Sequence, residues 1–158
     1  MPVAPVLGAG PTVGQIGTMT GAFDDITTAN RAHVNSFEWA DLGPVPSRGL
    51  AVVTCMDTRL DPLKVLGLQP GQAHIVRIAA GRCGPDVVDS LHRSHSMGVD
   101  RIAVIRHTDC KAAGADPSAD LLADVAMLRE DPDLAGATIG AFVYDTATGA
   151  LSPEGDPV

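Results

Sequence analysis

Two short apolar runs constrain the fold of this chain most strongly, because each ends abruptly in residues that can bind a metal or carry charge. The first run, residues 52–54, passes into Cys-Met-Asp-Thr-Arg at 55–59, and the second, residues 101–106, passes into His-Thr-Asp-Cys at 107–110. Near-continuous apolar runs are typical of strands buried in a parallel sheet. Because open α/β sheets bind ligands beyond the carboxyl ends of their strands, we expect both groups to lie at one edge of such a sheet.

The residue types at these two strand ends predict a metal site. His107 and Cys110 are close enough in sequence to reach one ion from a single turn, and Cys55 can supply a third ligand from the neighbouring strand end. Cys, His and Cys with one open position is the pattern of a catalytic zinc site. Two thiolates also favour zinc over magnesium, calcium or manganese.

A carboxylate and a guanidinium follow the first cysteine at alternate positions. In an extended chain, alternate side chains point to the same side, so Cys55, Asp57 and Arg59 are predicted to lie together. A surface ion pair without a catalytic role is the simpler alternative for Asp57 and Arg59.

The rest of the chain alternates between extended and helical patterns. This order predicts an α/β fold with a mostly parallel central sheet of about four strands, an antiparallel edge strand near Leu151 and helices on both faces. Strands are expected at residues 49–56, 73–80, 101–106 and 137–145, and helices at 24–39, from 62 to about 67, from 84 to 98 and from 116 to 131.

Length and composition bound the remaining possibilities. A chain of 158 residues suits one domain, and we expect residues 1–21 to form a flexible tail and residues 22–158 a single domain. The net charge of −8 argues against nucleic acid or membrane partners. Three cysteines without a disulfide spacing favour reduced thiols, and no run approaches the roughly 18 apolar residues of a membrane span. A soluble, cytoplasmic protein is therefore expected.

The motif Cys55-x-Asp57-x-Arg59 followed by His107-x-x-Cys110 resembles the signature of the β-class carbonic anhydrases. The resemblance extends from about residue 30 to the end of the chain and includes residues 73–77 and 142–145. It implies a zinc lyase in which Zn2+, held by the two cysteines and the histidine, provides a hydroxide that attacks carbon dioxide and yields bicarbonate. It also implies that Arg59 holds Asp57 away from the metal, and that the chain forms a homodimer or a higher homo-oligomer.

Three features depart from the family pattern. Many members have Arg-Asn-Ala-Gly after the second strand, whereas this chain has Arg77-Ile78-Ala79-Ala80, and Lys111 stands where a glycine usually follows the second zinc cysteine. The segment after Cys110 is also shorter than in typical members. We expect Ile78, Ala79, Ala80 and Lys111 to line the substrate pocket. Two alternatives therefore stay open: a zinc hydrolase of carbonyl sulfide or carbon disulfide, and a zinc-binding structural or regulatory homologue without turnover.

Overall fold

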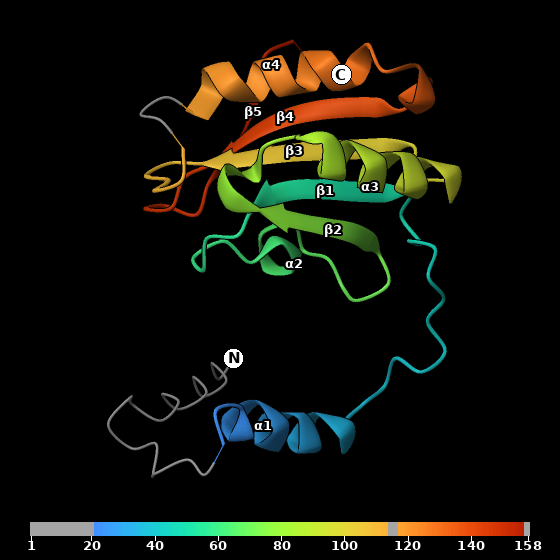
Figure 1. Ribbon diagram of the computed structural model, residues 1–158, viewed down its shortest axis with the longest axis vertical. Coiled ribbons are helices and arrows are strands. Elements are labelled where there is room, and N and C mark those ends of the chain that lie inside the picture. The colour runs from blue at the N-terminus through green and yellow to red at the C-terminus, as the bar shows by residue number, and fades with distance from the viewer. Residues whose placement is uncertain (1–20, 114–116, 157–158) are drawn as a thin grey trace, which may run out of the picture. The chain divides into compact units, whose positions relative to one another are not determined.

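The computed structural model describes residues 21–113 and 117–156 (Figure 1). The chain divides into two compact units, residues 1–40 and residues 41–158. The expected flexible tail lies outside the described residues except for Gly21. Among the described residues, no helix is both long and apolar enough to cross a bilayer.

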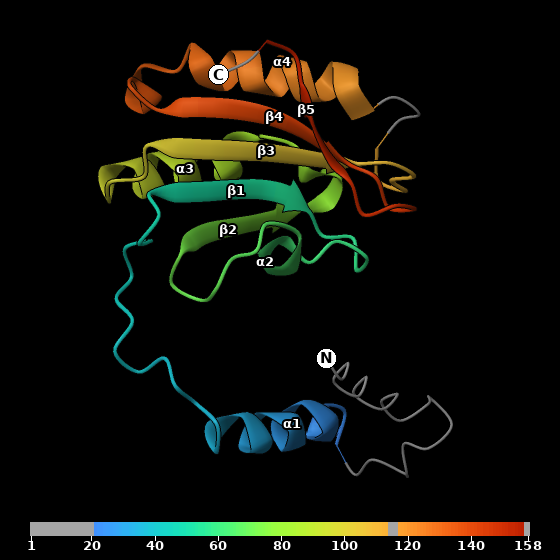
Figure 2. The same cartoon turned by 180° about the vertical axis from the view of Figure 1, so that it is seen from behind.

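The larger unit is built on one five-stranded sheet. The strands lie in the order β2-β1-β3-β4-β5. The first four are mutually parallel, and β5 runs antiparallel to β4 at the edge (Figure 2). The predicted α/β class with a mostly parallel sheet and an antiparallel edge strand is confirmed. The strand bounds are β1 (Leu50–Cys55), β2 (Ala73–Ile78), β3 (Arg101–His107), β4 (Thr138–Tyr144) and β5 (Leu151–Glu154).

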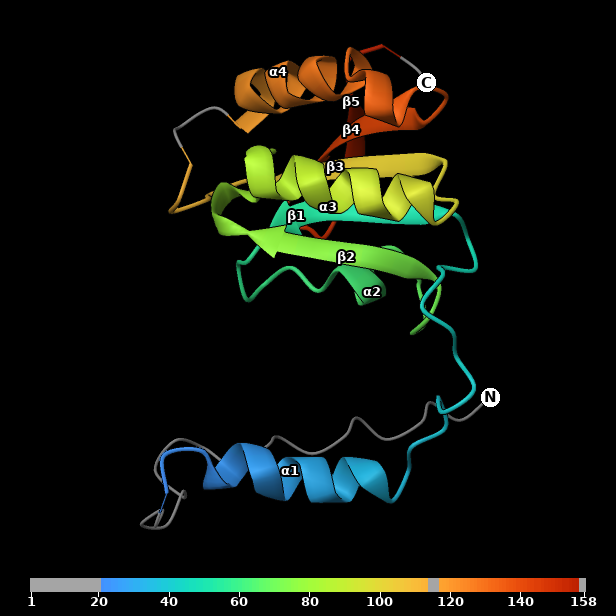
Figure 3. The same cartoon turned by 45° about the vertical axis from the view of Figure 1, so that its right-hand side comes forward.

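Helices cover the two faces of this sheet unequally. The long helices α3 (Pro85–Ser96) and α4 (Pro117–Arg129) pack on one face, and the single turn α2 (Pro62–Val65) lies on the other (Figure 3). Alternate strand residues separate the two sides, since Val53 and Val104 belong to the core under α3 and α4 while Val52 and Ile105 belong to the core on the α2 side. Burial on both faces explains why these strands read as continuous apolar runs.

The smaller unit contains helix α1 (Asp24–Val34), which is shorter than the predicted helix over residues 24–39. Asp24 and Asp25 lie in its first turn rather than at the cap, which is Phe23 and has no side-chain hydrogen bond. The aromatic rings of Phe37 and Trp39 lie beyond the helix end and pack against each other and against His33. The apolar spacing that predicted a longer helix therefore continues past Val34. In the segment beyond it, contacts between the rings take the place of the helix.

A tight turn at the end of β2 lies directly beside the end of β1. The predicted strand over residues 73–80 stops at Ile78, and residues 79–81 form the 3-10 turn η2. Ala80 and Gly81 both adopt positive φ values, 57° and 61°. A Cβ on Gly81 would lie 2.9 Å from the Thr54 carbonyl carbon. Only glycine allows this approach, so the turn packs against the backbone that leads into Cys55.

Candidate metal centre

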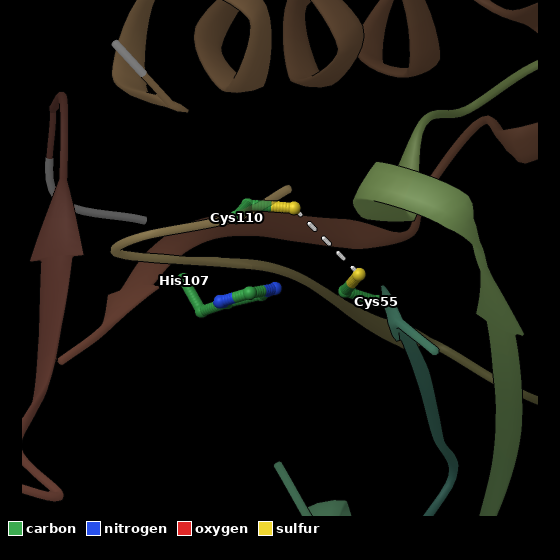
Figure 4. Close-up of side chains that lie close together, drawn as sticks. All are labelled: Cys55, His107 and Cys110. Carbon is green, nitrogen blue, oxygen red and sulfur yellow. Dashed lines mark hydrogen bonds between the residues drawn. The ribbon is translucent and has the colours of Figure 1, made fainter. Parts of the chain in front are cut away.

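The three predicted ligands come together at the carboxyl end of the sheet. Cys55 is the last residue of β1, His107 is the last of β3, and Cys110 lies in the turn that follows β3. Their ligand atoms all lie within 4.8 Å of one another, and the side chains point toward a common centre (Figure 4). Parallel pairing of β1 with β3 brings the two strand ends together.

The distance between the two thiols suits a shared metal rather than a disulfide. Cys55 Sγ and Cys110 Sγ are 3.9 Å apart, and both cysteines are free. Two zinc–sulfur bonds of about 2.3 Å at the tetrahedral angle would separate the sulfurs by about 3.8 Å, whereas a disulfide requires about 2.05 Å. The spacing therefore fits tetrahedral zinc.

A hydrogen bond on one ring nitrogen of His107 leaves the other nitrogen free to bind a metal. Its Nδ1 lies 2.8 Å from the Thr108 carbonyl oxygen, so Nδ1 carries the proton and Nε2 presents a lone pair. Nε2 is buried, and among the described residues it is the one buried side-chain nitrogen or oxygen without a hydrogen-bond partner. Because an unpaired buried polar atom is costly, and a backbone carbonyl bonded to the far nitrogen is typical of metal-binding histidines, this atom fits a metal ligand.

Two other groups in the larger unit fit a metal less well. His92, Asp131 and Asp133 also cluster within 4.8 Å, but His92 Nε2 already forms a 2.9 Å hydrogen bond to Asp131. Cys83 is buried, and desolvation raises the pKa of its thiol to about 11. A protonated, enclosed thiol is a poor ligand, so the first cluster is the best supported.

Asp57 and Arg59 lie beside the three ligands, but a turn brings them together rather than strand alternation. Strand β1 ends at Cys55, and the Asp57 carbonyl accepts a hydrogen bond from the Leu60 amide. The Asp57 carboxylate accepts bonds from Arg59 at Nε (3.0 Å), Nη2 (2.9 Å) and the backbone amide (2.9 Å). The expected proximity holds, although its predicted cause was wrong.

Electrostatics keep this pair ionised. The side-chain hydrogen bonds from Arg59, supported by its backbone amide, hold the pKa of Asp57 well below its usual range. The same bonds, with further ones to Asp109, raise the pKa of Arg59. Asp57 Oδ2 lies 3.9 Å from His107 Nε2. The site therefore presents a carboxylate that is ionised at neutral pH next to the proposed ligand atom.

Two residues of this site were not given roles by sequence reasoning. Arg77 donates to the carbonyl oxygens of Cys55 (3.1 Å) and Asp57 (2.7 Å) and so fixes the backbone between them. Asp109 binds Arg59 Nη1 (3.1 Å) and Lys111 Nζ (2.9 Å), and the lysine is the main cause that lowers the pKa of Asp109. The position of Asp109 between two proposed ligands was the signal that could have identified it.

A cavity of about 280 Å³ adjoins the cluster. Its lining includes Lys111, Asp57 and the two cysteines of the cluster. Ile78 pairs in register with Cys55 at the end of β2 and is exposed, whereas Ala80 is buried. Ile78, Ala79 and Ala80 are not among the residues that line this cavity, so their role in a substrate pocket stays a prediction. The full lining is Cys55, Met56, Asp57, Thr58, Cys110, Lys111 and Ala112.

Comparison with known proteins agrees with this geometry. Residues 50–130 match the carbonic anhydrase family model. The chain is 37% identical over 91 residues to beta-carbonic anhydrase 1 of Mycobacterium tuberculosis, covering 55% of this chain and 53% of that protein. It is 42% identical over 65 residues to carbon disulfide hydrolase of Acidianus sp. strain A1-3, covering 40% of this chain and 32% of that protein. The chain thus spans about half the length, or less, of these curated relatives.

The fold agrees as well. The crystal structure of carbonic anhydrase from Streptococcus mutans superimposes with a TM-score of 0.81 at 30% identity, covering 87% of this chain and 99% of that one. The family model includes β1, with Cys55, and β3, with His107, and therefore covers the strand ends that build the cluster. The chain belongs to the β-class carbonic anhydrase family.

Proposed function

We propose that this chain catalyses the reversible hydration of carbon dioxide to bicarbonate, with zinc held by Cys55, His107 and Cys110. The observation that carries the proposal is the buried, unpartnered Nε2 of His107, which faces two free thiols 3.9 Å apart. Zinc bound there would lower the pKa of a coordinated water to about 7 and so supply hydroxide at neutral pH.

Asp57 is proposed to accept a hydrogen bond from the attacking water and to help remove its proton. Its Oδ2 lies on the side of His107 Nε2, at 3.9 Å. Because its pKa is lowered by Arg59, the carboxylate accepts a hydrogen bond at neutral pH but does not keep the proton. The released proton must therefore pass on to buffer or to another side chain.

Arg59 is proposed to hold Asp57 in this role. Both carboxylate oxygens are bound by Arg59, so Asp57 cannot turn toward the metal unless these bonds break. Arg59 is in turn bound by the side chain and the backbone carbonyl of Asp109. The resemblance to the family suggests the same pair as the element that opens or closes the site.

Stopped-flow measurement of carbon dioxide hydration by the zinc-loaded protein tests the proposal. We expect catalysis in the parent and its loss, together with most of the bound zinc, in Cys55→Ser, His107→Ala and Cys110→Ser. Cys83→Ser is the matched control, because Cys83 is also a free cysteine but lies outside the cluster. Full zinc occupancy without hydration in the parent would overturn the proposal.

A second candidate reaction is the hydrolysis of carbonyl sulfide or carbon disulfide at the same centre. The exposed apolar side chain of Ile78 beside Cys55, and the similarity to a carbon disulfide hydrolase over 65 residues, favour including it. Sulfide release from either compound, with hydration absent, would assign the chain to this reaction. Zinc binding without either turnover would leave a structural or regulatory role.

We also propose that the chain acts as a homodimer or higher homo-oligomer. Contiguous exposed apolar surface is typical of contact sites, and in the smaller unit the rings of Phe37 and Trp39 pack against each other while both stay exposed. Light scattering of the purified protein should give at least twice the mass of 16.2 kDa. A monomeric mass with full activity would contradict this expectation. The exposed side chains are Phe23, Ile26, Val34, Phe37 and Trp39.

A further inference from the structure

A buried arginine lies immediately before the proposed ligand His107. Arg106 is 2% exposed and is the largest of the fully buried side chains among the described residues. It points to the face of the sheet that α3 and α4 cover, opposite to its neighbours in β3. Its Nη1 donates to the carbonyl oxygen of Gly81, and its Nη2 donates to the carboxylate of Asp124 on α4. One side chain thus connects β3, turn η2 and α4.

Asp124 completes the connection from the other side. Besides Arg106, its Oδ2 accepts hydrogen bonds from the Cys83 amide (2.9 Å) and from Arg82 Nε (3.0 Å), and Oδ1 accepts from Arg82 Nη2 (3.1 Å). Arg106 therefore holds the last carbonyl of the turn, and Asp124 holds the chain two residues later. The carboxylate is 8% exposed and fully hydrogen-bonded.

The turn held in this way lies against the first proposed ligand. A Cβ on Gly81 would lie 3.0 Å from the Cys55 amide nitrogen and 3.0 Å from Arg106 Nη1. The backbone at Cys55 is therefore packed directly on the turn, while His107 follows Arg106 in β3. A shift of the ion pair would move both ligand-bearing segments.

Stability alone does not account for this arrangement. Burying an ion pair carries a desolvation cost, and replacement by well-packed apolar residues is often neutral or stabilising. Here each partner also makes one hydrogen bond to the backbone beside the cluster, Arg106 to the Gly81 carbonyl oxygen and Asp124 to the Cys83 amide. We propose that Asp124 and Arg106 are positioning residues that set the geometry of Cys55 and His107, an inference that rests on the metal site proposed above.

The test replaces the pair without leaving a buried charge. The double variant Arg106→Met/Asp124→Leu removes both charges at similar volume, and Arg106→Lys keeps a cation but loses the fork that reaches both Gly81 and Asp124. Arg129→Met is the matched control, because Arg129 also ties α4 to the sheet, but does so through the Ile139 carbonyl near the amino end of β4. Zinc affinity is measured by chelator competition, and the cobalt-substituted proteins are compared by their thiolate-to-metal absorption bands.

We expect roughly 10- to 100-fold weaker zinc binding in both test variants, in line with the loss of residues that orient metal ligands, and altered cobalt bands at temperatures where the protein is folded. The control should keep the parent's affinity and bands. Parent-like affinity and bands in either folded test variant would overturn the proposal. Failure of the parent itself to bind zinc would overturn the metal site, and this inference with it.

Discussion

Two arginine–aspartate pairs flank the candidate metal centre and differ mainly in their exposure to water. Arg106 and Asp124 are 2% and 8% exposed, whereas Arg59 and Asp57 are 43% and 17% exposed. Both pairs lie next to proposed ligands, the first before His107 and the second after Cys55. The same chemistry is therefore present twice at one site in two different solvent environments.

The difference indicates different tasks. Breaking a buried pair leaves a charge that water cannot reach, so the pair is locked in place. Breaking an exposed pair has little cost, because water and salt replace the partner. The buried pair is suited to holding ligands still, and the exposed pair is suited to opening and closing next to the metal.

The largest effect is expected from breaking the buried pair on one side. Asp124→Ala leaves Arg106 buried without its carboxylate and should lower the free energy of unfolding by about 3–5 kcal/mol. Urea denaturation followed by circular dichroism measures this loss. Arg59→Ala should unfold close to the parent's midpoint, and equal losses in the two variants would remove the distinction between the pairs.

Breaking the exposed pair should lower catalysis without loss of zinc, whereas variants of the buried pair are expected to bind zinc more weakly. Arg59→Ala frees the Asp57 carboxylate next to a divalent cation, and we expect it to keep zinc while hydration falls about 10- to 100-fold, the range typical for residues that orient a metal site. Zinc content and stopped-flow rates measured on one sample check both parts. Asp57→Ala should also keep zinc.

A crystal structure of zinc-loaded Arg59→Ala shows directly whether the Asp57 carboxylate binds the metal once Arg59 is removed. We expect the Asp57 carboxylate to have turned to the metal. Asp57 remaining away from zinc, together with a parent-like hydration rate, would rule out the holding role of Arg59.

A smaller effect is expected in the turn that the buried pair holds. Ala80 has a φ of 57°, which costs a residue with a side chain roughly 1–2 kcal/mol, while glycine loses about 0.5–1 kcal/mol in chain entropy. Ala80→Gly should therefore raise the free energy of unfolding by roughly 0.5–1 kcal/mol. Ala79→Gly, at a residue without positive φ, should instead lower the free energy of unfolding, because only the entropy of the unfolded chain changes there. A similar loss in both variants would contradict the strain assigned to Ala80.

The smallest effect concerns pH and the exposed pair. Because the pKa of Asp57 is lowered by Arg59, the pair contributes stability above the ordinary aspartate pKa of about 3.9, and this contribution disappears as pH falls through the lowered value. The gap between the urea midpoints of metal-free parent and Arg59→Ala should be constant near neutral pH and shrink in acid. A gap that widens below pH ~4 would contradict the sign.

The two ion pairs also differ in how much of each could be predicted from the sequence. Apolar runs that end in Cys55 and His107 predicted both the strands and the edge at which they meet, because burial of a parallel sheet dictates that pattern. Arg106 ends the second of these runs, but its partner Asp124 is 18 residues away on a helix. Sequence periodicity carries no information on such a pairing, so the buried pair emerged only from the structure.

The geometry of the turns also could not be predicted from the sequence. Strand alternation was extended through Asp57 and Arg59, whereas β1 ends at Cys55 and a turn brings the pair together. Ala80 likewise gives no sign of a positive φ, since alanine is compatible with most structures. Short-range hydrogen bonds and close packing decide these conformations.

Zinc K-edge X-ray absorption of the zinc-loaded parent tests the central claim most directly. Ligation by Cys55, His107 and Cys110 predicts two sulfur neighbours at about 2.3 Å and two nitrogen or oxygen neighbours at about 2.0–2.1 Å. A shell with three or more sulfurs would bring in Cys83, and a shell without sulfur would place the metal elsewhere. Either result would contradict a centre built from the ends of β1 and β3.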